Sequence, residues 1–212
     1  YIFDKDGLKT DYDANKYLIG TPAIGNIDED DQLEIVFGGY SSPSSSSPIF
    51  AINPDGSDVD GFPFVLGERT KAGVALADFN GNGKVDIVVG TDDDNIYLIY
   101  DDATVASGFP YTTGDKVQVS PSVYKIDGEN IIFSGSNDNN MYAIRGDGSL
   151  LFSVSTGGEI SSSPSILDEN GDVSIFFGSD DDNIYAVDSD GNSLSGWPIA
   201  LDGTIGGSVV FS

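Results

Sequence analysis

The sequence contains neither histidine nor cysteine, and these two absences exclude much of enzyme chemistry. Without histidine there is no Ser-His-Asp or Cys-His catalytic centre and no imidazole ligand for a metal. Without cysteine there is no disulfide bond, thiolate nucleophile, iron–sulfur cluster or thiolate zinc site. The redox compartment stays open, because a cysteine-free chain is compatible with either side of a membrane.

Positive charge is also scarce. Nine Lys and Arg residues stand against 35 Asp and Glu residues, for a formal net charge of −26. Nucleic acid and anionic membrane surfaces both need a basic footprint, so we expect neither as a partner. Apolar runs of the roughly 18 residues that a membrane span requires are missing, so membrane insertion is not expected. Hard cations that bind oxygen are the ligands that this composition favours.

The chain does contain enough apolar material for a core, with 39% hydrophobic and 11% aromatic residues among 212. Its strongest signal is internal repetition. Four segments share one plan of short Val-, Ile-, Phe- and Tyr-rich runs bounded by Gly, Asp, Asn and Ser. Matching aromatic residues recur about every 45 residues, at Phe50, Tyr97, Tyr142 and Tyr185. Sustained helical periodicity is absent.

Each repeat reads as four short strands, which predicts an all-β protein, a β-propeller of four-stranded antiparallel blades. The first strand of each unit is small, as in Ser163-Pro164-Ser165, and is predicted to lie innermost, where space is limited. The Gly-Phe-Pro and Gly-Trp-Pro segments carry a proline that cannot donate to a ladder, so we expect them at the outer edge.

A single propeller domain is predicted, with blades at about 17–66, 67–113, 114–156 and 157–201. Residues 1–7 match a third strand and its turn, and residues 203–211 match a first strand, so residues 1–16 and 202–212 are predicted to belong to a split blade. Two alternatives follow. The ends join into a fifth blade that closes the ring, or the chain is an excerpt of a larger propeller.

The sharpest chemical motif spans residues 78–86. It places oxygen-bearing side chains at alternate positions and a carboxylate at the end, in the pattern that a tight calcium loop needs. Gly83 allows the sharp turn, and the Lys84 carbonyl can supply a further oxygen. The alternative is an Asn/Gly-rich hairpin turn. The predicted ligands are Asp78, Asn80, Asn82, Lys84 and Asp86.

Residues 77–90 resemble the FG-GAP-like repeat, the calcium-binding blade of integrin-alpha-type propellers. The resemblance implies calcium held between the first and second strands of a blade. The family's Gly-Ala-Pro signature is absent, with Ser120-Pro121-Ser122 and its equivalents in its place. The blade tails, such as residues 178–188, are also similar to quinoprotein-like repeats, but a single tryptophan, Trp197, gives no reason to carry over a quinone cofactor.

The first repeat has a variant of the same loop at residues 26–34. The spacing of oxygen ligands holds, and we predict a second calcium site, with a solvated acidic turn as the alternative. Asp31 replaces the glycine of the turn. The loop of the third repeat, 125–130, is too short for a site, and that of the fourth, 168–172, lacks the closing carboxylate. The ligands predicted in the first repeat are Asn26, Asp28, Asp30, Gln32 and Glu34.

A second acidic series, at 92–95, 137–140 and 180–183, is interpreted as polar hairpin loops rather than binding sites. The serine-rich segment 41–48 is interpreted as a flexible loop tip, either a tolerated insertion or a partner contact. Arg69, Lys71 and Arg145 break the repeat, and charge balance explains them more simply than an anion site. No catalytic residue is assigned, since a chance pair among 35 acids is no evidence.

These observations favour a non-catalytic, calcium-stabilised interaction module that is secreted or displayed at the cell surface, where calcium is millimolar. The expected partner is a protein or a glycan. The recurrent Phe62, Phe109 and Trp197 could floor sugar pockets, but packing of the outer strand explains them as well. The alternative function is a polysaccharide-active enzyme or its accessory domain. The sequence leaves the oligomeric state open.

Overall fold

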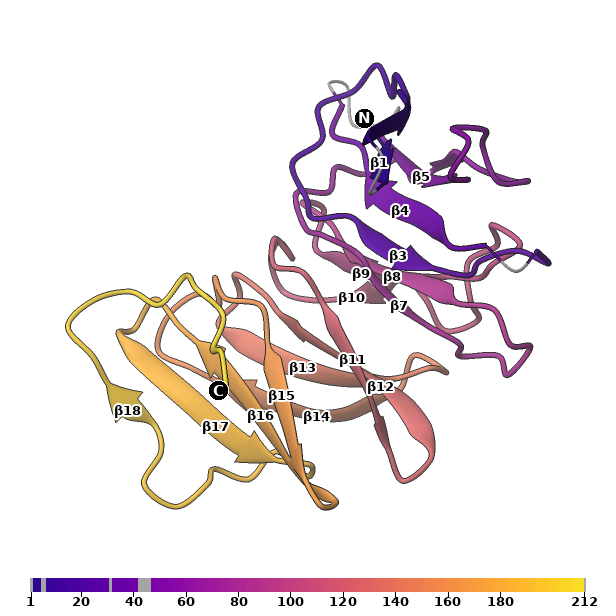
Figure 1. The fold of residues 1–212 in the computed structure, drawn as a ribbon. Helices are drawn as coiled ribbons and strands as arrows, with labels where there is room; N and C mark the ends of the chain where they lie inside the picture. Colours follow the sequence, from indigo (N-terminus) through magenta and orange to yellow (C-terminus); the bar gives the residue numbers. More distant parts are fainter. Residues whose placement is uncertain (1, 5–6, 31, 42–46, 212) are drawn as a thin grey trace.

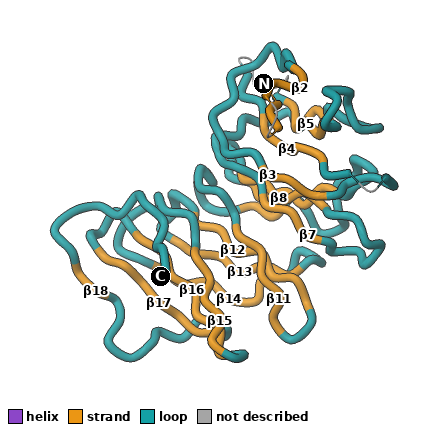
Figure 2. Tube along the Cα trace, viewed as in Figure 1, coloured by secondary structure: helices purple, strands orange, loops and turns teal. Residues whose placement is uncertain are grey.

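The structure is a computed structural model that describes residues 2–4, 7–30, 32–41 and 47–211. It confirms the predicted all-β class. The described residues form four four-stranded antiparallel sheets and one two-stranded hairpin, and none of them is helical (Figure 2). None therefore belongs to an apolar helix of membrane-spanning length.

The four sheets are the blades, and each follows chain order from its first strand to its fourth. Blade 1 consists of β3 (Ala23–Gly25), β4 (Glu34–Gly38), β5 (Pro48–Ile52) and β6 (Phe64–Val65). Blade 2 consists of β7 (Ala75–Ala77), β8 (Asp86–Gly90), β9 (Asn95–Ile99) and β10 (Tyr111–Thr112). Blade 3 consists of β11 (Ser122–Ile126), β12 (Glu129–Gly135), β13 (Asn140–Arg145) and β14 (Leu150–Ser155). Blade 4 consists of β15 (Ser165–Glu169), β16 (Asp172–Gly178), β17 (Asn183–Asp188) and β18 (Ile199–Ala200).

The first strands lie innermost, as their small residues predict. Contacts between successive blades run from β3 to β7, from β7 to β11 and from β11 to β15. The proline segments lie at the outer edge, also as predicted. The Phe62–Pro63, Phe109–Pro110 and Trp197–Pro198 peptide bonds are cis, and each precedes a two-residue fourth strand that pairs only with the third.

The hydrophobic core lies between blades rather than within one, because side chains alternate between the two faces of each sheet. In blade 2, Ile87 and Val89 face blade 1, whereas Val88 faces blade 3. Three clusters fill the three junctions between blades, and a fourth covers the outer side of blade 1. Loops at the blade ends therefore sit on a rigid framework.

The linkers between blades make close contacts with the glycine that ends each second strand. A Cβ atom at Gly90 would lie 2.3 Å from the side chain of Val117, and one at Gly135 would lie 2.3 Å from that of Ile160. Both linker residues are fully buried. The recurring glycine is thus required by the approach of the next linker.

The two ends of the chain do not meet. Hairpin strands β1 (Ile2–Asp4) and β2 (Gly7–Thr10) pair only with each other, at one end of the arc of blades (Figure 1). Residues 202–211 lie along blade 4 at the other end, where the Ser165 hydroxyl donates to the Val209 carbonyl at 2.7 Å. No strand pairing among the described residues joins these segments, so the structure is an open arc, as in the second of the two alternatives.

Candidate metal centre

The two loops predicted to bind calcium occupy equivalent places in blades 1 and 2, between the first and second strands. Each is tied to its sheet by the acid that begins the second strand. Glu34 accepts a hydrogen bond from the Ile27 N–H at 2.9 Å, and Asp86 accepts one from the Phe79 N–H at 2.8 Å. Both acids are fully buried. The two loops, which share the same spacing in the sequence, therefore share the hydrogen bond that ties the start of the loop to the second strand.

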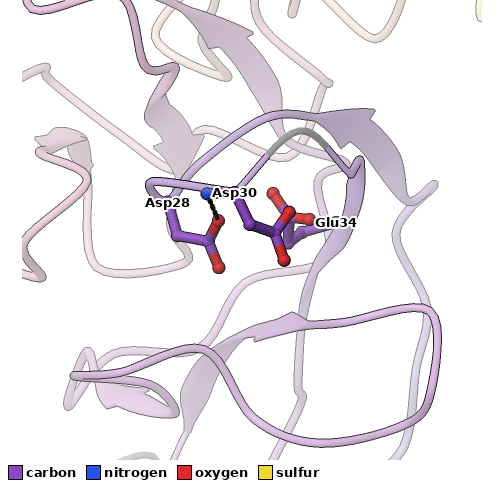
Figure 3. A group of neighbouring side chains, drawn as sticks. All are labelled: Asp28, Asp30 and Glu34. Atoms are coloured by element: carbon purple, nitrogen blue, oxygen red, sulfur yellow. Dashed lines mark hydrogen bonds between the residues drawn. The ribbon is translucent and has the colours of Figure 1, made fainter.

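In blade 1 three acids form a group. Carboxylate oxygens of Asp28, Asp30 and Glu34 all lie within 4.8 Å of one another. Figure 3 shows the three side chains gathered on the same side of the loop. It is the one group of three or more acids with this proximity in the described part of the chain. The loop holds its shape by short-range bonds, since Asp28 accepts from the Asp30 N–H at 2.9 Å.

Two buried oxygens in this loop have no hydrogen-bond donor. They are Oε1 of Glu34 and Oδ1 of Asn26, both on residues that the sequence predicted as ligands. A buried acceptor without a partner costs about 1–3 kcal/mol. Burial raises the pKa of Glu34, and the charges of Asp28 and Asp30 raise it further, against the opposing effect of the Ile27 N–H. These oxygens and acids fit a hard divalent cation, which would supply the missing positive charge.

Gln32, the remaining ligand predicted in this loop, is turned toward Asp30. Its backbone N–H and its side-chain amide both donate to the Asp30 carboxylate, at 2.6 and 3.0 Å. The side chain thus positions Asp30. Asp31, which replaces the glycine of the turn, lies outside the described part of the chain.

The loop in blade 2 is organised differently, because its oxygens already have donors. Asp78 accepts from the Gly81 N–H at 2.6 Å and from the Gly83 N–H at 2.9 Å. The Asn80 side-chain oxygen accepts from the Asn82 N–H at 3.0 Å, and that of Asn82 accepts from the Lys84 N–H at 2.8 Å. The side-chain oxygens of Asp78, Asn80 and Asn82 therefore accept hydrogen bonds from the backbone of their own loop.

Asp101, which the motif did not include, closes the blade 2 loop from the turn after β9. Its carboxylate accepts from the Asn82 amide at 2.8 Å and lies 3.2 Å from the Lys84 ammonium, Nζ. Burial acts to raise the pKa of Asp101, but bonds from Asn82, Lys84 and Asn80 outweigh it and hold the pKa below its usual value. The signal in the sequence is a departure from the repeat, since the equivalent positions are Pro54, Gly146 and Ser189.

Charge is balanced unevenly between the two loops. Lys84 also reaches Glu29, 3.6 Å from its Oε1, so one ammonium group bridges the blade 1 and blade 2 loops. Burial raises the pKa of Asp86 to about 6 even though the N–H groups of Phe79 and Asp101 act to lower it. The group in blade 1 has no cation within its own loop.

The third and fourth loops are tight turns. Asp127-Gly128 and Asn170-Gly171 are two-residue hairpin connections with positive φ at both positions. Asp168 accepts from the Gly171 N–H and from the Tyr124 hydroxyl, both at 2.6 Å. The third loop is thus shortened to a two-residue connection, as its sequence indicates.

The second acidic series, in the loops 137–140 and 180–183, joins each blade to the linker that precedes it by hydrogen bonds, which we call latches. This role supports the interpretation of these loops as structural hairpins. Asp138 accepts from the Tyr142 hydroxyl at 2.6 Å and from the Gly114 N–H of the preceding linker at 2.7 Å. Asp181 does the same with Tyr185 and Gly157. In blade 2 the corresponding tyrosine, Tyr97, donates instead to Glu68 at 2.7 Å.

Two of the three basic residues that break the repeat, Lys71 and Arg145, are paired with acids, as expected, whereas Arg69 has other partners. Lys71 lies 3.4 Å from Asp92, and Arg145 lies 3.4 Å from Glu129. Arg69 donates to the Ser41 carbonyl at 3.1 Å and packs over the Tyr40 ring, 5.5 Å from its centre. Residues 42–46 of the serine-rich segment lie outside the described residues.

Comparison with known proteins identifies the fold but no more specific property. No protein-family model and no curated protein matches the chain. Among solved structures, BamB from Moraxella catarrhalis is similar at 17% identity with a TM-score of 0.62, over 84% of this chain and 48% of that one. The Dos1 propeller matches at 15% identity with a TM-score of 0.61, over 88% and 48%. BBS1N in complex with ARL6DN matches at 10% identity with a TM-score of 0.60, over 89% and 58%.

The matched solved structures are β-propellers, which supports the propeller-type repeat fold. This chain spans about half of their length. The finer resemblance to the calcium-binding FG-GAP-like repeat stays a prediction.

Proposed function

We propose that this chain is a non-catalytic β-propeller module that binds a partner protein and is stabilised by calcium in the loop 26–34. The observation that carries the proposal is the buried, unpartnered Oε1 of Glu34 beside the carboxylates of Asp28 and Asp30. Three acids held within a few ångströms of one another repel unless a cation lies among them.

Calcium suits this site better than other metals for two reasons. The available ligands are oxygens only, because the chain has no histidine or cysteine. The loop is irregular and partly exposed, and calcium accepts 6–8 oxygens in a flexible geometry, whereas magnesium demands a near-ideal octahedron. Loops of this kind fill where calcium is millimolar, which supports a secreted or cell-surface location.

Loop 78–86 is the second calcium site of this proposal, and a weaker one. Its carboxylates retain lone pairs beyond the hydrogen bonds that they accept. A cation there would have to compete with the Lys84 ammonium, which already neutralises Asp101. We therefore expect the blade 1 loop to fill at lower calcium concentration.

The propeller fold supports the interaction role. Its short loops stand on rigid blades, an arrangement that is suited to presenting binding residues. The matched BBS1N was solved in complex with ARL6DN, so at least one propeller of this similarity binds a protein. The net charge of −26 favours a basic surface on the partner.

Thermal unfolding in EDTA and in millimolar calcium tests the cation. We expect calcium to raise the midpoint, by an amount that corresponds to about 2.7 kcal/mol at 100 times the dissociation constant. The double variant Asp28→Asn, Asp30→Asn should lose most of this rise. Asp180→Asn, Asp182→Asn, which changes two acids outside both loops, should keep it. Equal shifts in both double variants would show that calcium acts on the general negative charge and would overturn the site.

A further inference from the structure

Three buried side-chain oxygens of blade 1 have no hydrogen-bond donor, and one of them belongs to a residue outside the loop 26–34. Besides Oε1 of Glu34 and Oδ1 of Asn26, the third is Oδ1 of Asn53, the residue that follows β5. In the described part of the chain, the one other buried side-chain atom without a partner is Oγ of Ser134 in blade 3. Buried acceptors without a donor are rare in folded proteins, so three of them in one blade indicate a shared cause.

Strand pairing places Asn53 opposite Glu34. Ile35 of β4 pairs with Ile52 of β5, so the next pair in this antiparallel register is Glu34 with Asn53. The equivalent positions pair in blades 3 and 4. Side chains of opposed residues lie on the same face of a sheet, with Cβ atoms about 4.5–5.5 Å apart. Because Ile35 and Ile52 point away from blade 2, Glu34 and Asn53 both point toward it.

Hydrogen bonds within the turn after β5 fix the orientation of the Asn53 amide. Its Nδ2 donates to the Ser57 hydroxyl oxygen, Oγ, at 3.1 Å. The Ser57 hydroxyl uses its single proton to donate to Asp55 at 2.6 Å, so Ser57 can only accept from Asn53. Nδ2 therefore points to Ser57, and Oδ1 points away from it. The turn thus holds a buried acceptor at the position opposite Glu34.

Comparison of the two blades explains why Glu34 lacks a donor. In blade 2, Oδ1 of Asp86 accepts a hydrogen bond from the Asp101 N–H at 3.1 Å. Glu34 is the blade 1 counterpart of Asp86, but the counterpart of Asp101 is Pro54. Proline has no N–H group to donate. Blade 1 therefore presents a free acceptor, next to Asn53, where blade 2 has a hydrogen bond.

We propose that Asn53 is a calcium ligand of blade 1, supplied by the end of β5 and not by the loop 26–34. The inference rests on the proposed calcium site and adds a ligand to it. Gln32, which the spacing assigned to that site, donates its amide to Asp30 instead, so the loop offers one ligand fewer than its spacing predicts. Calcium binds amide carbonyl oxygens together with carboxylates, so Oδ1 of Asn53 is a suitable replacement.

Calcium titration of the full chain against a chromophoric chelator tests the inference. We expect Asn53→Ala to weaken binding at the site that Asp28→Asn, Asp30→Asn removes. The loss should be at least the roughly 10-fold that removal of an outer-shell partner costs in metal sites. Asn192→Ala is the matched control, because it truncates an exposed asparagine in the corresponding turn of blade 4, and it should leave calcium affinity unchanged.

Asn53→Asp separates a ligand from a residue that only supports the turn. The substitution keeps a side-chain oxygen, adds a negative charge and removes the donation to Ser57. In EDTA its unfolding midpoint should fall, because a fourth carboxylate joins Asp28, Asp30 and Glu34. Its calcium affinity should nevertheless rise, because affinity increases with the charge of the ligands. A purely structural role would instead weaken calcium binding in both Asn53 variants.

The outcomes distinguish this inference from the proposed function. If Asp28→Asn, Asp30→Asn removes the site and Asn53→Ala keeps full affinity, the calcium site stands and Asn53 is not a ligand. A buried water molecule would then be the partner of its Oδ1. If the unsubstituted protein binds no calcium, the proposed function fails and this inference fails with it. If Asn53→Ala is too unstable to titrate, Asn53→Asp decides: tighter binding supports the inference, and equal or weaker binding overturns it.

Discussion

Glu34→Gln should stabilise the protein in the absence of calcium and destabilise it, relative to the unsubstituted protein, when calcium is bound. The substitution keeps the shape of the side chain and an oxygen that can accept from the Ile27 N–H. It removes one negative charge from a fully buried position. It also replaces the oxygen Oε1, which accepts no hydrogen bond, by an amide nitrogen. Without calcium, the loss of repulsion stabilises the protein. With calcium, the loss of a ligand charge weakens the bound state.

The distances set the size of the effect. At the 4.8 Å limit within the group, two unit charges repel by about 0.9 kcal/mol in a water-like dielectric and about 3.5 kcal/mol at an effective dielectric of 20. Asp30 is exposed, so the lower part of this range applies. We expect Glu34→Gln to gain roughly 1–2 kcal/mol in EDTA, and each kcal/mol corresponds to about 2–4 °C in a chain of this size.

The pH dependence follows from the same contact. Because burial and the charges of Asp28 and Asp30 raise the pKa of Glu34 on folding, the folded state holds this proton more tightly than the unfolded chain. In EDTA this group therefore lowers stability as pH rises from the ordinary value of 4.5 through the raised value. Glu34→Gln should remove that part of the slope.

Differential scanning calorimetry of both proteins, in EDTA and in saturating calcium, measures the reversal. Glu159→Gln is a matched control, because it neutralises an exposed glutamate far from the group and should leave both midpoints nearly unchanged. If Glu34→Gln were less stable than the unsubstituted protein in EDTA, the repulsion argument would be refuted. If calcium stabilised both proteins equally, Glu34 would not be a ligand.

Two further predictions concern the blade 2 loop and the latches between blades. Asp101→Asn should lower stability at pH 7 by roughly 1.5–3 kcal/mol, since the bonds to Asn82 and Lys84 lose their charge. Because the pKa of Asp101 is lowered on folding, this difference should vanish as pH falls below the ordinary value of 3.8, and urea unfolding at several pH values measures it. Asp138→Ala should cost about 2–3 kcal/mol by leaving the Tyr142 hydroxyl and the Gly114 N–H without their acceptor. Asp180→Ala, at an exposed position, should cost little, and equal urea midpoints for the two would contradict the latch.

The fold could be predicted from the sequence because its signals are local and repeated four times. Each blade is a meander of consecutive strands, so strand order needs no long-range information. The small residues around Ser122 and the proline of Phe62–Pro63 fix which strand lies inside and which lies outside. The relation between the two ends could not be predicted in the same way, because it depends on curvature summed over all junctions and no single residue encodes it.

The candidate site was predicted only in part. Spacing located both loops and the buried acids Glu34 and Asp86, since the backbone of a first-to-second-strand connection repeats with the blade. Spacing could not include Asp101, which comes from a different turn and is adjacent only after folding. It also gave no account of Lys84 beyond its carbonyl, although the ammonium group is what neutralises the blade 2 loop.

The two loops differ in the hydrogen-bond donors that they contain, and this difference is the basis for expecting a cation in one of them first. Asparagine offers N–H groups as well as oxygen, so Asn80 and Asn82 can supply Asp101 and Asp86 with hydrogen bonds from within the loop. Ionised acids are acceptors only, and the loop 26–34 has Asp28 and Asp30 in place of those amides. Its remaining side-chain amides, Asn26 and Gln32, donate to Asp30, so the buried Oε1 of Glu34 has no donor. A match to the calcium-ligand spacing indicates that the backbone of a loop has a suitable geometry. A buried oxygen without a hydrogen-bond donor indicates that positive charge is missing there. We therefore expect calcium to stabilise the less regular loop, 26–34, more than the loop 78–86.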